Sequence, residues 1–216
     1  MNTWRRSLRA TTSRRYRGRL GVLMVLALSC TGAHAAQAEQ ANVQNAGQTA
    51  QSQQTASAAP REMTLVTLNL HHDREDWPAR RAYIAKELKQ LAPDVIALQE
   101  VIERRGSVEN QAAWLARRLG YAYTFASVDP PGAPKRYGNA LLSKRRVLAQ
   151  HQRLLQPLDD YRVAAHLQVD MDGRPVNVYV THLNERSDAR GAATRTRQVA
   201  DLLDFIASNS NQAPMV

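Results

Sequence analysis

Three polar side chains stand where apolar strands are expected to end: Asn69, Glu100 and His182. They close the runs TLVTLN, DVIALQE and VNVYVTH. Binding sites of α/β proteins lie at the carboxyl ends of strands. Removing a carboxylate such as that of Glu100 from water is costly unless a cation or a hydrogen-bond donor lies beside it. Glu100 is therefore expected to be a functional carboxylate with such a partner.

Asn69 and His182 each have a structural interpretation as well. An asparagine at a strand end can cap the following loop through its own side chain as readily as it can bind a ligand. His182 shares a strand face with Val176, Val178 and Val180, so strand alternation points it toward the interior. Taken alone, a histidine there belongs more often to a core than to a catalytic site.

The positive charge of the chain is concentrated in its first 35 residues. The 216 residues carry a formal net charge of +10, but residues 1–35 hold seven arginines and no acid. The remainder has 22 basic and 19 acidic side chains, which is close to balance. With 44% hydrophobic and 22% charged residues, the composition is that of one globular domain and excludes a fibre or an integral membrane protein.

The N-terminal region predicts an export signal, at residues 1–35, followed by a linker. An arginine-rich start precedes the apolar stretch LGVLMVLAL, which is too short to span a bilayer, and AHA or AQA offers a cleavage site. We expect a periplasmic or secreted protein, by either the Sec or the twin-arginine route. Lipid anchoring at Cys30 is the less favoured alternative. Residues 36–61, rich in Ala, Gln and Ser, have little to bury and are expected to be disordered.

The folded domain is expected over residues 62–216. A strand at MTLVTLNL leads into a helix that Asp76 caps and Pro93 ends, with its buried stripe at Ile84, Leu88 and Leu91. The strand DVIALQEV and a helix at QAAWLARRL, which stops at the glycine of position 120, come next.

Five strand candidates then follow without an intervening helix. They are YAYTFA, GNALLS, VLAQHQRLL, YRVAAHLQV and PVNVYVTHL. A closing helix places four apolar residues on one face: Val199, Leu202, Leu203 and Ile206. The order of elements predicts an α+β protein, with a mixed sheet and helices packed on one face.

Four motifs occur in an order that closely resembles the endonuclease/exonuclease/phosphatase superfamily, the deoxyribonuclease I-like metal-dependent hydrolases. The motifs are TLNLHH, PDVIALQEV, YGNALLSK, and VNVYVTHL followed by RTRQVADLL. The resemblance covers residues 63–216, and its most specific parts are ALQEV and THL with an Arg-x-x-Gln helix, Arg195 to Gln198. It implies the N-terminal half of a four-layer α/β/β/α sandwich and a hydrolase of phosphoric esters that is monomeric when full length.

The resemblance also implies roles for the three strand-end residues. Glu100 matches the glutamate that binds a divalent cation, Mg²⁺ or Mn²⁺, and Asn69 matches the asparagine beside it in the metal and phosphate shell. His182 matches the histidine that contacts the scissile phosphate. A hard cation held by a carboxylate neutralises the charge that gathers on phosphoryl oxygens during cleavage.

Three further residues are expected to bind the substrate: His71, Asn139 and Arg195. His71 stands where many relatives have an acid or a glycine-rich loop, and Asn139 lies on a strand that borders the cleft in the family. Arg195 shares a helix face with apolar residues, so it must reach a partner or the surface.

Two other clusters have competing interpretations. A zinc site at His71, His72 and Asp73 is a rival for the first loop, although a second ligand cluster at proper spacing is missing. The loops APKRYG and SKRRV are expected to lie close together, either as a patch for a phosphate backbone or as ordinary surface. Their basic residues are Lys135, Arg136, Lys144, Arg145 and Arg146.

The remaining catalytic groups of the family, an Asp-x-Asn strand end and a terminal Asp-His pair, would follow residue 216. The chain is therefore expected to be a fragment of a longer enzyme that supplies about one of the two sheets. With the inner face of that sheet open, it would be inactive and poorly soluble by itself.

The substrate class stays open among three alternatives. Nucleic acid comes first, and a lipid headgroup or inositol phosphate, as in sphingomyelinases and inositol-phosphate phosphatases, comes second. The third is a non-catalytic binding module of the same fold.

Overall fold

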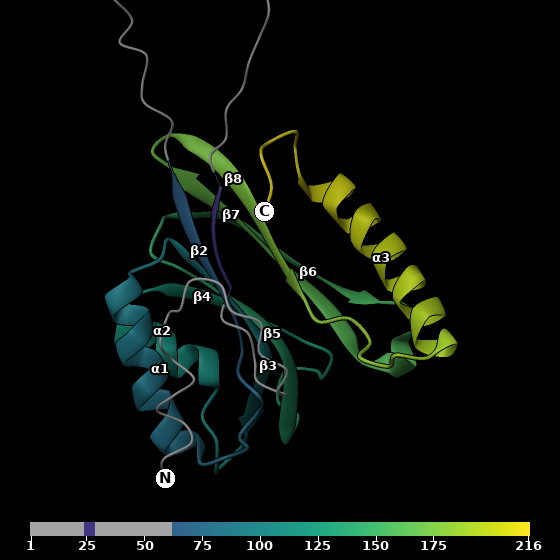
Figure 1. Cartoon of the computed structure of the whole chain (residues 1–216), viewed down its shortest axis with the longest axis horizontal. Coiled ribbons are helices and arrows are strands. Elements are labelled where there is room, and N and C mark those ends of the chain that lie inside the picture. The colour runs from purple at the N-terminus through teal and green to yellow at the C-terminus, as the bar shows by residue number, and fades with distance from the viewer. Residues whose placement is uncertain (1–23, 29–61) are drawn as a thin grey trace, which may run out of the picture.

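The computed structural model describes residues 24–28 and 62–216, which form four layers (Figure 1). The predicted linker, Cys30 and most of the predicted export signal lie outside the described residues. The elements are β1 (Met24–Leu28), β2 (Met63–Asn69), α1 (Trp77–Leu91), β3 (Val95–Arg104), α2 (Gln111–Leu119), β4 (Ala122–Ser127), β5 (Lys135–Ser143), β6 (Val147–Leu155), the 3-10 helix η2 (Leu158–Asp160), β7 (Arg162–Met171), β8 (Arg174–Thr181) and α3 (Ala189–Asn209).

The strands form two sheets. The larger has five strands in the order β1-β2-β3-β5-β4, and only its β2 and β3 are parallel to each other. The smaller is the antiparallel meander β6-β7-β8, whose edge is extended by residues 214–216 through a bridge between Asn177 and Met215. β1 comes from the apolar stretch of the predicted export signal and pairs with β2.

Each face of the larger sheet packs against a different layer. One face contacts α1 and α2 through residues such as Val66, Ile96 and Leu98. The alternate residues of the same strands, such as Leu65 and Ala97, pack against the smaller sheet. α3 covers the far face of the smaller sheet (Figure 1). The expected four-layer α/β/β/α class is therefore confirmed.

The expectation of an open inner face is wrong. The chain leaves the larger sheet after Ser143, the last residue of β5, and its next three strands form the smaller sheet. Val163, Leu167 and Val178 of the smaller sheet cover the inner face of the larger one. A strand-by-strand interpretation missed this because apolar alternation shows that a strand has a buried face, but not which sheet the strand joins. The physical ground for expecting poor solubility therefore no longer holds.

Helix faces were predicted with mixed success. Ile84 and Leu88 of α1 are buried as expected, but Leu91 in its last turn is 41% exposed. In α3, Val199 and Leu203 are also exposed. The buried face of α3 instead carries Gly191, Gln198 and Phe205, because the helix docks through a polar contact as well as through an aromatic ring.

Asp94 ties the connection between the two sheets to the start of the larger one. Its carboxylate accepts hydrogen bonds from the Thr64 N–H at 2.8 Å and from Arg145 Nε at 2.7 Å, and its carbonyl accepts from the Lys144 N–H. Burial by itself would raise the pKa of Asp94, but these donors outweigh it and hold the pKa below its ordinary value.

Replacing Asp94 by Asn should therefore give a pH-dependent loss of stability. The lowered pKa means that the ionised carboxylate stabilises the fold fully above the unfolded value, about 3.9, and that this contribution is lost as the pH falls through the folded value. At pH 7 we expect Asp94→Asn to lower the free energy of unfolding by about 1–3 kcal/mol. Urea unfolding at pH 7 and pH 3 measures this, and the gap between variant and native chain should shrink at pH 3. Asp204→Asn, on the exposed side of α3, is the control; equal gaps at both pH values would contradict the assignment.

Candidate functional site

Glu100 lies at an irregularity in β3. Leu98 pairs with Ala140 and Val101 pairs with Gly138, so Gln99 and Glu100 together face one residue of β5. This β-bulge leaves Glu100 in a left-handed backbone conformation with φ 55°, which costs a side-chain-bearing residue about 1–3 kcal/mol. The bulge re-aims the glutamate side chain out of the regular alternation of the strand.

The carboxylate of Glu100 lies between two histidines. His72 Nε2 is 3.1 Å from Oε2, and His182 Nδ1 is 3.9 Å from Oε1. The contact with His72 lacks hydrogen-bond geometry, so the buried Oε2 has no hydrogen bond within the described part of the chain. The side chain of Glu100 is only 16% exposed. The structure therefore brings together Glu100, from β3 of the larger sheet, and His182, the residue that follows β8 of the smaller sheet.

Both histidines have pKa values below the ordinary range. Burial is the largest cause for each, and Glu100 opposes it in each case. Arg162 lowers the pKa of His182 further, since Arg162 Nη1 lies 3.5 Å from His182 Nδ1. Both imidazoles are therefore neutral at pH 7 and can accept a hydrogen bond as well as donate one.

Arg162 lies beside His182. At the start of β7 it pairs with Glu185, which follows β8, and its Nε lies 3.3 Å from Asp160 Oδ2. Its side chain is only 11% exposed. Arg162 and Tyr137 also interact, while burial raises the pKa of Tyr137. His182 thus lies between the carboxylate of Glu100 and the guanidinium of Arg162.

Asp160 and Gln198 clamp the loop that follows His182. Gln198 Nε2 donates to Asp160 Oδ2 at 2.5 Å, and Gln198 Oε1 accepts from the Asn184 N–H at 2.9 Å. Asn184 Nδ2 donates to Asp160 Oδ1 at 2.7 Å. Since Gln198 is fully buried, α3 holds this loop through a closed set of hydrogen bonds.

Asn69 stands beside Glu100 at the same edge of the sheet. It pairs with Gln99 in the parallel ladder of β2 and β3, and the next N–H, that of Leu70, donates to the Gln99 carbonyl. The Oδ1 of Asn69 accepts from the His71 N–H at 2.8 Å, which caps the loop and leaves its second lone pair free. Asn69 therefore combines both roles weighed from the sequence: its side chain caps the loop, and its Oδ1 is also available as a ligand for a metal ion.

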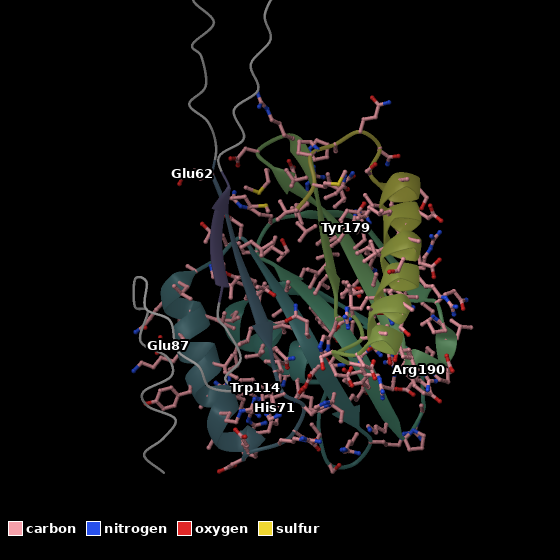
Figure 2. All side chains as sticks on the ribbon, turned by 45° about the vertical axis from the view of Figure 1, so that its right-hand side comes forward. Glu62, His71, Glu87, Trp114, Tyr179 and Arg190 are labelled. Atoms are coloured by element: carbon pink, nitrogen blue, oxygen red, sulfur yellow. The ribbon has the colours of Figure 1, made fainter. Side chains whose placement is uncertain are left out.

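The three expected substrate-binding residues have different positions. His71 is exposed and lies near the start of α1, at the same end of the molecule as Arg190 at the start of α3 (Figure 2). Asn139 is buried, and its Nδ2 donates to the Val163 carbonyl at 2.8 Å, which joins the two sheets. Arg195 does reach a partner: its Nη1 donates to the Asn184 carbonyl at 3.1 Å. Neither of the last two side chains is directed at the Glu100 cluster.

The two basic loops do not form one patch, contrary to expectation. They lie at opposite ends of β5, about 30 Å apart for nine residues of extended chain. Four of the five basic residues are in ion pairs with acids: Arg136 with Glu103, Lys144 and Arg145 with Asp94, and Arg146 with Asp170. Lys135 has no ion pair among the described residues.

The rival zinc site does not assemble either. Asp73 pairs with Arg104 at 2.8 Å, while His72 faces Glu100. Across residues 62–216, no three His, Cys, Asp or Glu side chains gather in a way that would hold a metal.

The donors at Glu100 fit a hard divalent cation better than zinc. A buried carboxylate oxygen without a hydrogen bond and an amide oxygen on the neighbouring strand are oxygen ligands of the kind that Mg²⁺ prefers. Mg²⁺ keeps several waters and is commonly bound through one or two carboxylates, so a large protein cluster is not required.

Sequence reasoning missed three participants: His72, Arg162 and Tyr137. His72 was weighed only as a zinc ligand, and its ring stacks on Tyr137 with centroids 5.1 Å apart. The one signal for Arg162 was a charged residue at the start of the apolar strand YRVAAHLQV.

No helix in the described part of the chain has the length and apolarity needed to cross a bilayer.

Comparison with known proteins gives consistent matches. The sequence profile of the Endonuclease/Exonuclease/phosphatase family matches residues 66–216. Nocturnin of Drosophila melanogaster is 29% identical over 157 residues, which are 65% of this chain and 23% of that protein. The chain thus spans about a quarter of this curated relative.

Solved structures agree on the fold. An endonuclease/exonuclease/phosphatase family protein from Leptotrichia buccalis superposes with a TM-score of 0.53 at 17% identity, over 66% of this chain and 62% of that one. ANGEL2, described as a 2′,3′-cyclic phosphatase, gives a TM-score of 0.51 at 27% identity, over 63% of this chain and 40% of its own.

Gln198 provides a direct test of the clamp on the loop after His182. Gln198→Ala removes the acceptor of the buried Asn184 N–H, so we expect the amide exchange rate of Asn184 to rise at least about threefold, as the loss of a net hydrogen bond predicts. Hydrogen exchange followed by NMR measures this. Arg197→Ala, one residue away on the exposed side of α3, should leave the rate unchanged. If both variants protect Asn184 equally, α3 does not hold the loop.

Proposed function

Since the chain belongs to the endonuclease/exonuclease/phosphatase family, we propose that it hydrolyses phosphoric esters, as a phosphodiesterase that depends on a divalent cation. The observation that carries the proposal is the carboxylate of Glu100, which stands at a strained bulge and has one buried oxygen without a hydrogen bond among the described residues. A fold retains such strain and such an unsatisfied group mainly where they serve a site.

Glu100 and Asn69 are the residues that would hold the cation, Mg²⁺ or Mn²⁺. Once bound, the cation neutralises the charge that develops on the phosphoryl oxygens. The bulge already turns the Glu100 carboxylate out of the regular alternation of β3, where it would be available to hold such a cation.

His182 and Arg162 are the groups that would engage the phosphate. The neutral imidazole can donate one N–H to a phosphoryl oxygen, and the guanidinium beside it supplies a permanent positive charge. Glu185 and Asp160 orient the guanidinium, and the clamp from α3 keeps the loop of His182 in place. Substrate binding therefore depends on both sheets and on α3.

Nucleic acid or a nucleotide is the proposed substrate class. ANGEL2 is described as a 2′,3′-cyclic phosphatase, and primed numbers denote the sugar atoms of a nucleotide. The site of this chain adds cationic and aromatic side chains around the Glu100 cluster, which suit a phosphate joined to a planar base.

The cation proposal is tested by metal binding, which requires no turnover. We expect Glu100→Gln to weaken Mn²⁺ binding at least about tenfold, because the carboxylate proposed to bind the cation is lost. Titration calorimetry with Mn²⁺ measures this on the whole chain. The control is Glu87→Gln on α1 (Figure 2), which should bind as the native chain does.

Hydrolysis of an oligonucleotide with and without Mg²⁺ is measured in parallel. Any magnesium-dependent cleavage should disappear in Glu100→Gln and remain in Glu87→Gln. If Mn²⁺ binds both variants equally, the metal site is not at Glu100. Metal binding without cleavage would favour the non-catalytic module, or an enzyme whose other groups lie outside these residues.

We propose as well that the protein is exported, from the arginine-rich start and apolar stretch of residues 1–35. Expression in a bacterium with a periplasm should give a product cleaved after position 35 or 38, which lacks β1 and has β2 as the edge of the larger sheet. Intact-mass measurement of the periplasmic fraction detects it. A full-length product confined to the cytoplasm would contradict export.

A further inference from the structure

A cleft of about 400 Å³ adjoins the Glu100 cluster. Three separate parts of the chain form it: the loop after β2, the connection between β4 and β5 with the first residues of β5, and the residue that links η2 to β7. Its lining residues are His72, Val128, Asp129, Lys135, Tyr137 and Tyr161. His72 contacts Glu100 on its other side, so the cleft opens beside the proposed phosphate position.

Tyr161 is exposed to solvent, and hydrogen bonds hold the residues on both sides of it in the chain. Tyr161 is 64% exposed, and its φ of 54° is a left-handed conformation that is unfavourable for a tyrosine. The residues on either side, Asp160 and Arg162, are both held by hydrogen bonds to the His182 loop or to each other. The strained backbone therefore places an exposed aromatic ring next to the residues of the proposed phosphate site.

The opposite wall of the cleft is equally ordered. The Tyr137 N–H donates to Asp129 Oδ2 at 2.8 Å, and the Asp129 N–H donates to Ser127 Oγ at 3.1 Å. Tyr137 stacks on His72. The carboxylate of Asp129 is thus engaged with the backbone, and its negative charge is partly compensated.

The cleft is lined by two tyrosines and a histidine, together with one cation, Lys135, and one acid, Asp129. Lys135 lines it without an ion pair among the described residues. Arg162 lies next to Tyr161 in the chain and interacts with Tyr137. Such a lining suits a planar base with an attached phosphate. The charge of Lys135 attracts a phosphate and repels a quaternary ammonium such as that of choline.

We propose that this cleft binds the nucleoside of a nucleotide substrate, with the base stacked on Tyr161 and a neighbouring phosphate at Lys135. The inference rests on the proposed function only for the position of the scissile phosphate. It makes Tyr161 a specificity-determining residue, since stacking on its ring distinguishes a nucleotide from other phosphoric esters.

The test compares ligands that differ only in the base. Calorimetry on the whole chain with 5′-AMP and with ribose 5-phosphate should show at least about fivefold tighter binding of 5′-AMP, as base–aromatic stacking predicts. Tyr161→Ala should remove this preference, and Tyr161→Phe, which keeps the ring, should retain it. Because Tyr161 is exposed, both variants are expected to fold.

The phosphate at Lys135 is tested with a second ligand pair. Adenosine 3′,5′-bisphosphate should bind more tightly than 5′-AMP to the native chain and to Lys86→Ala, a control on α1. The advantage should disappear in Lys135→Ala, and an advantage that persists there would remove Lys135 from the proposal.

Three results would overturn the inference: equal binding of 5′-AMP and ribose 5-phosphate, a base preference that survives in Tyr161→Ala, or tighter binding of phosphocholine than of 5′-AMP. Failure of the proposed function gives a different result. In that case Glu100→Gln binds Mn²⁺ as the native chain does, while the base preference and its loss in Tyr161→Ala are still observed.

Discussion

The geometry of the site depends on one constraint, the removal of the Glu100 carboxylate from water at a β-bulge. In a regular strand, the side chain of Glu100 would follow the alternation of its neighbours in β3. The left-handed backbone of Glu100 at the bulge shows that it departs from this alternation. The cost of the conformation and of the unsatisfied oxygen must be offset by the packing of both sheets around it. A ligand with positive charge would convert this cost into binding free energy.

The two-sheet sandwich makes that arrangement available. Glu100 comes from the larger sheet, while His182 and Arg162 come from the smaller one, so their meeting requires the sheets to pack face to face. The apolar residues packed between the sheets therefore determine the distance from Glu100 to His182 and Arg162. Asn139 contributes in the same way, because its amide bonds across to the Val163 carbonyl.

α3 has a second role beyond covering the smaller sheet. Its buried side carries Gln198, whose amide joins Asp160 to the loop after His182. A buried amide is costly unless every donor and acceptor has a partner, and this network supplies them. α3 therefore packs on the smaller sheet and also holds the loop after His182 through hydrogen bonds. The apolar residues Val199 and Leu203 lie on its exposed side.

The sequence by itself determined the elements and their class, because hydrophobic periodicity, caps such as Asp76 and the glycine after α2 act over a few residues. The strand ends singled out Glu100 and His182, and the resemblance of the motifs assigned both to one site. Only the tertiary structure decided that the meander forms a separate sheet, that His72 and Arg162 flank the pair, and that the basic loops lie apart. These features depend on contacts between residues distant in the chain, whose free energies no local pattern records.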